Sequence, residues 1–288
     1  MSFTIADLRL LLQTLGEIAL VLLFLRWYEP RMLYYPNHPG RQVTRTPADA
    51  GLNYEPVTLT TVDNVRVSAW LLPADRPDAP TLLFFHGNAG NLGHRVEKCR
   101  VFHELGLQIL VLDYRGYGDS EGRPSEKGTY RDADAAYQYL TQTRGIAPKD
   151  IVLYGESLGS GVAVDLASRV PVGGVILEAA YTSVADTGQQ IFWFLPGIIR
   201  LLVYNRYDSR RKIARINAPL LQLHSRQDRV FSYERHAERL FAAAREPKQL
   251  VPLRGTHNDA FFVSEPLSRQ AIQDFLPDTT VRAPQTFR

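Results

Sequence analysis

A serine flanked by glycines follows directly after an apolar run of the chain. The run Ile151–Tyr154 leads into Gly155-Glu-Ser157-Leu-Gly159, where a helical apolar pattern begins. Glycines two positions either side of a serine permit a sharp strand-to-helix turn in which a Cβ would collide with neighbouring backbone. We predict that this turn presents Ser157 as a nucleophile. The alternative is a serine that caps a glycine-rich helix start.

A serine nucleophile needs a general base, and the base needs an acid that holds its tautomer. With a turn of this kind the usual chain order is serine, acid, histidine, the last two on loops after late strands. His257 is the only one of the seven histidines that follows the last apolar run, and we predict it as the base. Asp228, which follows the run Leu220–Leu223, is the predicted acid. Glu178 is the second candidate, and a turn aspartate paired with a neighbouring arginine is the alternative role for Asp228.

Attack on a carbonyl creates an oxyanion, which two backbone N–H groups must stabilise. Leu158, the residue after the serine, supplies the first. The glycine-containing loop His86–Gly90 follows the apolar run Thr81–Phe85, and the Asn88 N–H is the candidate for the second. This loop has neither the lysine-ending phosphate motif nor G-x-G-x-x-G, and no metal-ligand spacing such as H-E-x-x-H occurs in the chain. We therefore expect no cofactor and no metal.

Six short apolar runs alternate with helical segments in the body of the chain. Such runs are typical of strands that are buried on both faces of a parallel sheet. Ahead of them, Val57–Thr61 and Val65–Leu72 flank a turn signal at Asp63-Asn64 and predict an antiparallel hairpin at a sheet edge. The pattern predicts an α/β fold with a mostly parallel, doubly wound sheet, in which function gathers beyond the C-terminal ends of the strands. The six runs are Thr81–Phe85, Gln108–Leu112, Ile151–Tyr154, Gly174–Leu177, Leu220–Leu223 and Gln249–Leu253.

The N-terminal segment is far more apolar than the rest of the chain. Nine leucines lie from Leu8 to Leu25, with Glu17 near the middle. We predict residues 1–29 as a hydrophobic helix that anchors the chain in a membrane as a single span. An amphipathic helix lying on a bilayer or a partner and a cleaved signal peptide are the alternatives. Residues 30–50 are predicted as a linker, and the arginines after the span favour the cytoplasm for the folded domain.

Residues 51–280 are predicted to form one folded domain with an insertion at about residues 179–214. The insertion contains the apolar and aromatic runs Ile191–Leu195 and Ile198–Tyr204. They predict a small helical cap over Ser157 that binds an acyl chain or touches the bilayer, with ordinary core packing as the equal alternative.

Composition excludes several other classes of protein. The 288 residues are 45% hydrophobic and 22% charged, as in an ordinary globular chain rather than a disordered or fibrous one. The net charge is +3 and the chain has no long runs of like charge, so the sequence lacks the basic clusters that are typical of nucleic-acid-binding proteins. Cys99 is the single cysteine, so an internal disulfide is impossible, and its surroundings do not predict thiol chemistry.

Five segments together resemble the α/β-hydrolase superfamily over roughly residues 55–275. The residues of these segments are similar to those of the membrane-anchored α/β-hydrolase-domain-containing group. This group includes fungal Bem-type proteins and animal protein depalmitoylases. The resemblance implies an α/β-hydrolase fold with Ser157, Asp228 and His257 as a catalytic triad. The segments are His86–Gly90, Asp113–Gly122, Gly155–Gly159, Asp228 and Gly255–Asp259.

The residues and the resemblance predict a serine hydrolase that cleaves acyl esters or thioesters through an acyl-enzyme. The expected partners are a membrane and a small-molecule or lipid acyl substrate, or an acylated protein. A peptidase or amidase that uses the same triad is one alternative. A membrane-tethered binding protein without activity on the same fold is the other.

Overall fold

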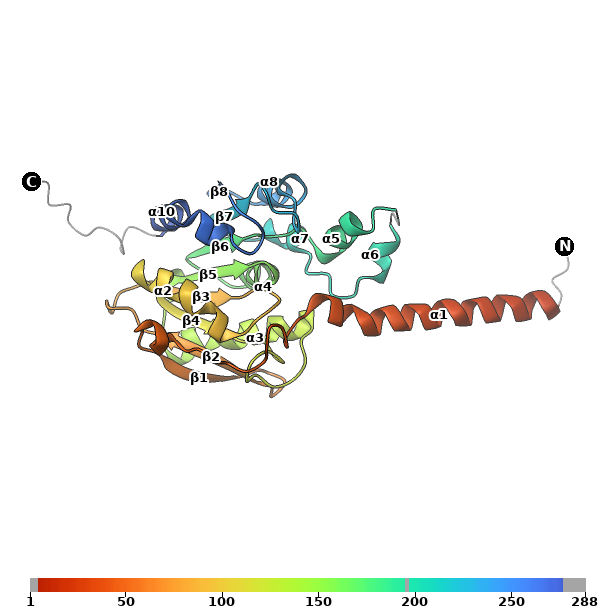
Figure 1. The fold of residues 1–288 in the computed structure, drawn as a ribbon, viewed down its shortest axis with the longest axis horizontal. Coiled ribbons are helices and arrows are strands. Elements are labelled where there is room, and N and C mark those ends of the chain that lie inside the picture. Colours follow the sequence, from red (N-terminus) through yellow and green to blue (C-terminus); the bar gives the residue numbers. More distant parts are fainter. Residues whose placement is uncertain (1–4, 195–196, 277–288) are drawn as a thin grey trace, which may run out of the picture.

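An eight-stranded sheet lies at the centre of the computed structural model, which describes residues 5–194 and 197–276 (Figure 1). β2 (Arg66–Leu72) pairs antiparallel with both β1 (Glu55–Thr60) and β4 (Gln108–Leu112), and the other neighbouring strands pair parallel. The mostly parallel sheet with an antiparallel edge hairpin confirms the predicted fold class. In sheet order the strands are β1 (Glu55–Thr60), β2 (Arg66–Leu72), β4 (Gln108–Leu112), β3 (Thr81–Phe85), β5 (Ile151–Glu156), β6 (Gly174–Glu178), β7 (Leu220–Ser225) and β8 (Lys248–Leu253).

Helices cover both faces of the sheet because its central strands are apolar on both sides. β3, β6 and β7 are buried along their whole length. One core packs under α2 (Val96–Glu104), α9 (Ala260–Val263) and α10 (Glu265–Phe275). The other packs under α3 (Glu126–Gln138), α4 (Leu158–Ala167), α7 (Ser209–Ile213) and α8 (Glu238–Ala243). Short helical turns complete the body: the 3₁₀ helices Pro47–Ala50, Leu92–Arg95 and Pro148–Asp150, and the π-helical turns Tyr139–Thr143 and Tyr233–Ala237.

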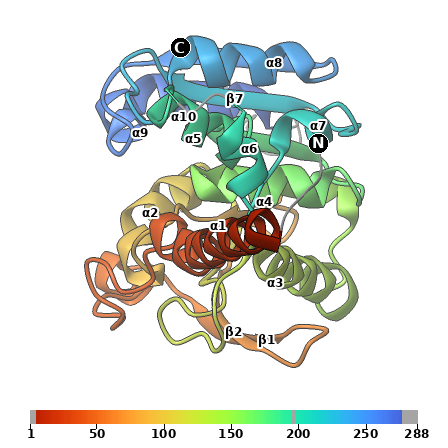
Figure 2. The ribbon, with the colours of Figure 1, turned by 90° about the vertical axis from the view of Figure 1, so that its right-hand side faces the viewer.

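The chain between β6 and β7 carries α5 (Val184–Ile191), α6 (Ile198–Leu202) and α7. α5 and α6 lie at the end of the body from which α1 leaves (Figures 1 and 2). After α5 the side chains of Trp193 and Phe194 are 75% and 60% exposed. These two aromatic side chains therefore face outward rather than into the core.

The N-terminal helix α1 (Ile5–Leu33) projects away from the body (Figure 1). Its 29 residues correspond to a length of about 43 Å at 1.5 Å per residue. The stretch Arg9–Leu33 is long and apolar enough to cross a membrane, by length and composition. The helix continues through Pro30, so its last turn belongs to the segment 30–50 that the sequence suggests as a linker.

The C-terminal end of α1 is bonded to the base of the insertion. The Glu29 carboxylate accepts hydrogen bonds from the backbone N–H groups of Tyr204 (3.0 Å) and Asn205 (2.9 Å). Tyr34, which is buried directly after the helix, lies with its hydroxyl 2.9 Å from that of Tyr207. These bonds set the direction in which α1 leaves the body.

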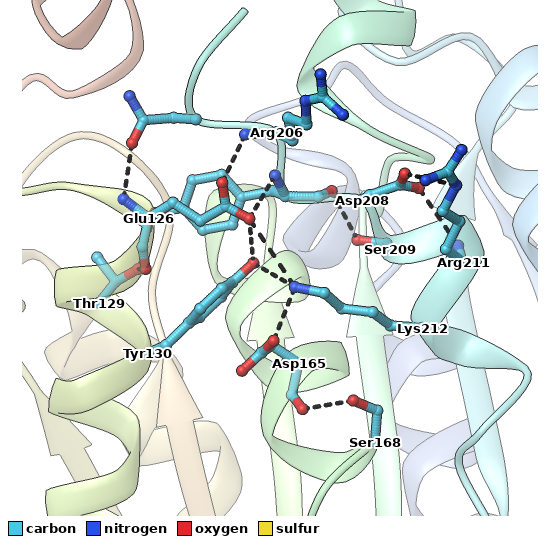
Figure 3. A network of polar contacts seen from close by, with 12 residues as sticks. Glu126, Thr129, Tyr130, Asp165, Ser168, Arg206, Asp208, Ser209, Arg211 and Lys212 are labelled. Carbon is cyan, nitrogen blue, oxygen red and sulfur yellow. Dashed lines mark hydrogen bonds and ion pairs between the residues drawn. The ribbon is translucent and has the colours of Figure 1, made fainter.

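The base of the insertion is in turn bonded to α3 and α4 (Figure 3). Glu126 at the start of α3 accepts the backbone N–H groups of Arg206 (2.6 Å) and Tyr207 (2.9 Å). Lys212 donates to Asp165 of α4 at 2.7 Å. α1, the insertion, α3 and α4 are thus joined through polar contacts.

Residues 34–50 lie on the body. The Arg41 guanidinium donates to the carbonyl oxygens of Gly118 (2.8 Å) and Ser120 (3.0 Å). The buried Asn91 side chain donates to the carbonyls of residues 40, 41 and 42. The segment between helix and sheet is therefore held at several points along its length.

Candidate active site

The turn after β5 holds its serine in a strained conformation. Ser157 has φ 50° and ψ −116°, which an L-residue rarely adopts. A Cβ at Gly155 would lie 2.5 Å from the carbonyl oxygen of Gly159, and one at Gly159 would lie 2.0 Å from that of Phe85. Both positions require glycine because backbone approaches them closely, as the spacing of the two glycines predicted.

Three side chains from separate loops meet at the C-terminal ends of the strands. Ser157 Oγ lies 3.0 Å from His257 Nε2, and His257 Nδ1 lies 2.7 Å from Asp228 Oδ2. Asp228 follows β7 and His257 follows β8, so these three predicted residues are brought together from three different strands. In this geometry an imidazole that is protonated on Nδ1 can accept the serine proton on Nε2.

The Asp228 carboxylate is buried and hydrogen-bonded through both oxygens. Oδ1 accepts the backbone N–H groups of Val230 and Phe231, each at 2.8 Å. Burial raises the pKa of Asp228, but the hydrogen bond and charge of His257 and the Phe231 N–H outweigh burial and hold that pKa below its usual value. The neighbouring His224 has Nε2 2.8 Å from the Phe231 carbonyl, and burial lowers the pKa of His224. The lowered pKa values favour an ionised Asp228 beside a neutral His224.

Glu178, the second candidate for the acid, lies in a different cluster. Its carboxylate accepts hydrogen bonds from Lys98 Nζ (2.6 Å) and from the Tyr154 hydroxyl. Lys98 also lies 3.2 Å from Glu156, the residue before the serine. Burial raises the pKa of Glu178. The Glu178 carbonyl accepts the Ser157 N–H at 2.9 Å, so this residue supports the turn and the histidine is bonded to Asp228.

The two predicted oxyanion residues lie beside the serine. Asn88, Leu158 and Ser157 line a small cavity of about 60 Å³. The other residues that line it are mostly apolar: Leu33, Tyr181, Val184, Thr187 and Phe231. A short apolar group next to the serine fits this cavity better than a charged one does.

The loop that carries Asn88 is held from two directions. The Tyr114 and Tyr117 hydroxyls donate to the carbonyls of His86 and Asn88, each at 2.9 Å. From the other side, the Tyr35 N–H donates to the Asn88 carbonyl at 3.0 Å. The Asn88 side-chain amide donates to the Leu33 carbonyl at 3.2 Å, so the end of α1 helps to shape this loop.

The sequence reasoning assigned no role to these supporting residues. Tyr114 and Tyr117 stand among the glycines of the segment Asp113–Gly122, and two tyrosines in a tight loop after a strand are a signal that was available there. The carbonyl of Leu33 and the N–H of Tyr35 are backbone groups. The residue types at those positions do not predict these backbone bonds to a distant loop.

Among residues 5–194 and 197–276, no group of three or more histidine, cysteine, aspartate or glutamate side chains is placed to hold a metal ion. Cys99 is buried, and burial raises the pKa of its thiol to about 12. The thiol is therefore not ionised near neutral pH.

Comparison with known sequences assigns the family. The chain belongs to the alpha/beta hydrolase family, which matches residues 82–282. An uncharacterized protein of Mycobacterium tuberculosis is 35% identical, covering 91% of this chain and 92% of its own length. Protein bem46 of Schizosaccharomyces pombe is 32% identical over 94% of this chain and 93% of its own. Lysophosphatidylserine lipase ABHD12 of Danio rerio is 31% identical over 72% of this chain and 60% of its own.

Solved structures share the fold at lower identity. The Pyrococcus furiosus esterase Pf2001 superposes with a TM-score of 0.68 at 20% identity, covering 85% of this chain and 98% of that one. The family match and the sequence relatives confirm the resemblance to α/β-hydrolase-domain proteins. The esterase structure shows the shared fold, and the family match places the chain among the α/β hydrolases.

Proposed function

We propose that this protein is a serine hydrolase that cleaves acyl esters or thioesters through an acyl-enzyme intermediate. One observation carries the proposal: Ser157, His257 and Asp228 form a hydrogen-bonded series on a strained turn and the two loops beside it. Family membership and the lysophosphatidylserine lipase among the relatives support an acyl ester as the substrate.

In the proposed reaction Ser157 Oγ attacks the acyl carbonyl carbon while His257 Nε2 takes the hydroxyl proton. The carbonyl oxygen becomes an oxyanion that accepts hydrogen bonds from the Asn88 and Leu158 N–H groups. As the carbon–oxygen or carbon–sulfur bond to the leaving group breaks, His257 returns the proton to the departing alcohol or thiol. The acyl group remains as an ester on Ser157.

Water completes the cycle by the same route. His257 takes a proton from water, and the resulting hydroxide attacks the acyl carbonyl carbon through a second oxyanion. The bond to Ser157 Oγ then breaks, the serine recovers its proton from His257, and the acid is released. Asp228 holds the imidazole in the required tautomer and stabilises its positive charge in both halves.

We also propose that α1 anchors the enzyme in a membrane, with the hydrolase domain in the cytoplasm, and that acyl chains reach Ser157 from the bilayer. The cavity beside the serine is lined by Leu33 of α1 and Val184 of α5. α5 lies at the end of the body from which α1 leaves (Figure 1), and Trp193, two residues after α5, is exposed. Retention of the full-length protein in membranes after alkaline extraction is expected, and its release would contradict the anchor.

Covalent labelling with a fluorophosphonate tests the chemistry directly. The detergent-extracted protein should label, and both Ser157→Ala and His257→Ala should abolish labelling. Ser168→Ala is the matched control, because Ser168 is a partly exposed serine at the end of α4 and should leave labelling unchanged. Absence of labelling in the folded parent protein would overturn the proposal.

Substrate selection follows from the same preparation. Oxygen esters and thioesters of increasing acyl length should be hydrolysed faster than aminoacyl amides. A preference for the amides would instead assign the triad to a peptidase or amidase.

A further inference from the structure

A groove of about 790 Å³ lies where α1 meets the body, apart from the cavity at Ser157. One wall is the last two turns of α1 and the residues after it, and the other is the loop before α3. The groove holds no candidate nucleophile, and its arginine side chains take no part in the reaction proposed above. Its lining residues are Arg26, Trp27, Pro30, Arg31, Tyr34, Tyr35, Pro36, Asn37, His38, Arg123 and Pro124.

The charges of this groove are all of one sign. It is lined by three arginines and one histidine, and no aspartate or glutamate is among the lining residues that the structure describes. Two arginines of the insertion are paired, Arg200 with Asp186 (2.8 Å) and Arg211 with Asp208 (3.3 Å). An arginine-lined groove without a carboxylate fits an anionic ligand.

The arginines are held in place without being neutralised. The Arg31 guanidinium lies 3.8 Å above the Trp27 ring and donates to the Trp27 carbonyl at 2.7 Å. Arg26 stacks 3.8 Å above the Tyr204 ring. Within the described residues, neither of them nor the exposed Arg123 forms an ion pair. The nearest acid on α1, Glu29, is bonded instead to the backbone at the base of the insertion.

The groove also lies at a defined depth along α1. Towards the N-terminus from it, most of the exposed side chains of α1 are apolar, as at Leu20, Val21 and Phe24, and Gln13 and Glu17 are exposed among them. At the groove itself Trp27 and Tyr35 are exposed. Exposed aromatic residues next to arginines, directly after an apolar span, mark the headgroup level of a bilayer.

We propose that this groove binds the phosphate of an anionic glycerophospholipid from the surrounding membrane. Arg31 and Arg123 face the phosphate oxygens from opposite walls, and Trp27 contacts the glycerol backbone. The bound lipid is a ligand of the anchor junction rather than a substrate, so the proposal rests on the proposed membrane anchor and is independent of the reaction at Ser157.

The test uses full-length Ser157→Ala, so that no lipid is cleaved, with Trp193→Phe to leave Trp27 as the tryptophan at the membrane interface. The protein is placed in phosphatidylcholine nanodiscs that contain a small, equal mole fraction of brominated phosphatidylglycerol or brominated phosphatidylcholine. Bromine quenches tryptophan at short range, so the quenching ratio between the two discs reports local enrichment of the anionic lipid. Trp70 is buried in β2 and serves as a constant background.

We expect the anionic lipid to be enriched about fivefold for each contributing arginine. Arg31→Gln with Arg123→Gln should bring the ratio to one, and Arg31→Lys with Arg123→Lys should retain enrichment. Arg235→Gln with Arg239→Gln is the matched control: it removes the same charge at two exposed arginines of the segment 233–243 and should change nothing.

Three results would overturn the proposal. They are a ratio of one in the parent protein, an equal loss in the control variant, and abolition of enrichment by millimolar inorganic phosphate, which would identify free phosphate as the ligand. Fluorophosphonate labelling of the same variants in the Ser157 background separates this outcome from the proposed hydrolase activity, because labelling does not require the side chains of Arg31 and Arg123.

Discussion

Replacing Asp228 by asparagine should inactivate the enzyme through the orientation of one amide. Asp228 Oδ1 faces two backbone N–H donors, and Oδ2 faces Nδ1 of His257. The amide oxygen of asparagine must occupy the first position, because an NH₂ group there would oppose two donors. Its NH₂ group then faces His257 and donates to Nδ1.

That reversal moves the proton of the imidazole. An Nδ1 that accepts a hydrogen bond carries no proton, so the neutral ring is protonated on Nε2, the atom 3.0 Å from Ser157 Oγ. His257 can then no longer accept the serine proton. The same tautomer error in a serine protease costs about 10⁴ in kcat, which corresponds to about 5.5 kcal/mol in the barrier.

The assay is steady-state hydrolysis of a short p-nitrophenyl ester, and Ser157→Ala gives the background rate. Thermal unfolding should show that Asp228→Asn is folded, since the substitution keeps the size of the side chain. Glu178→Gln is the comparison. It disturbs the bond to Lys98, so it should lower the melting temperature, while kcat falls much less than in Asp228→Asn. A loss below tenfold in folded Asp228→Asn, or a larger loss in folded Glu178→Gln, would refute the assignment of the acid.

Three further predictions follow from packing and ionisation. Gly159→Ala should prevent folding or lower the melting temperature sharply in a thermal scan, since its Cβ would lie 2.0 Å from the Phe85 carbonyl oxygen; an unchanged melting temperature would contradict the close approach. Deletion of residues 1–25 should leave hydrolysis of a soluble ester intact, whereas deletion of 1–38 should reduce kcat by about a hundredfold through the loop at the oxyanion; equal activities would show that the end of α1 does not support the site. Burial lowers the pKa of His236 to about 4, below about 6.5 in the unfolded chain, so the unfolded state binds more protons between these values and the unfolding free energy falls as pH drops from about 6.5 to 4. Urea titrations at pH 7 and pH 4.5 should show that His236→Gln removes about 1–3 kcal/mol of that fall, and identical pH dependence in the variant would contradict it.

The sheet could be predicted from the sequence because each strand is a local pattern. A strand that is buried on both faces must be apolar at successive positions, and the runs at residues 81–85 and 220–223 lie within β3 and β7. The serine turn was predictable for a similar reason, since the glycines that a close approach demands are neighbours of Ser157 in the chain. In both cases the residues that determine the structure are close together in the sequence.

The choice between the two acids depended on information that is not local. Asp228 and Glu178 both lie at the C-terminal ends of buried strands, β7 and β6. His257 follows β8, and β8 pairs with β7 rather than with β6. Strand order therefore decides which carboxylate the imidazole meets, and strand order is set by packing across the whole sheet.

The end of α1 was the least predictable part of the site. Local composition describes residues 8–25 as apolar and residues 30–50 as polar and rich in proline and arginine, which is the description of an anchor and a tether. The contacts that make this end part of the body are a carboxylate on the backbone of the insertion, a buried tyrosine pair and two backbone bonds to the Asn88 loop. Their partners lie at least fifty positions away along the chain.

These contacts give the anchor a consequence for catalysis. A domain on a flexible tether would present its active site to the bilayer only part of the time. Here the helix that we propose enters the membrane is bonded both to the insertion beside the serine and to the loop that carries Asn88, so its direction fixes the direction of the site. Leu33 ends the helix and lines the cavity at Ser157, and the exposed Trp193 and Phe194 follow α5, which lies at the same end of the body (Figure 1). Because Leu33 joins the proposed anchor to the cavity at the serine, we propose membrane lipids rather than soluble esters as the natural substrates.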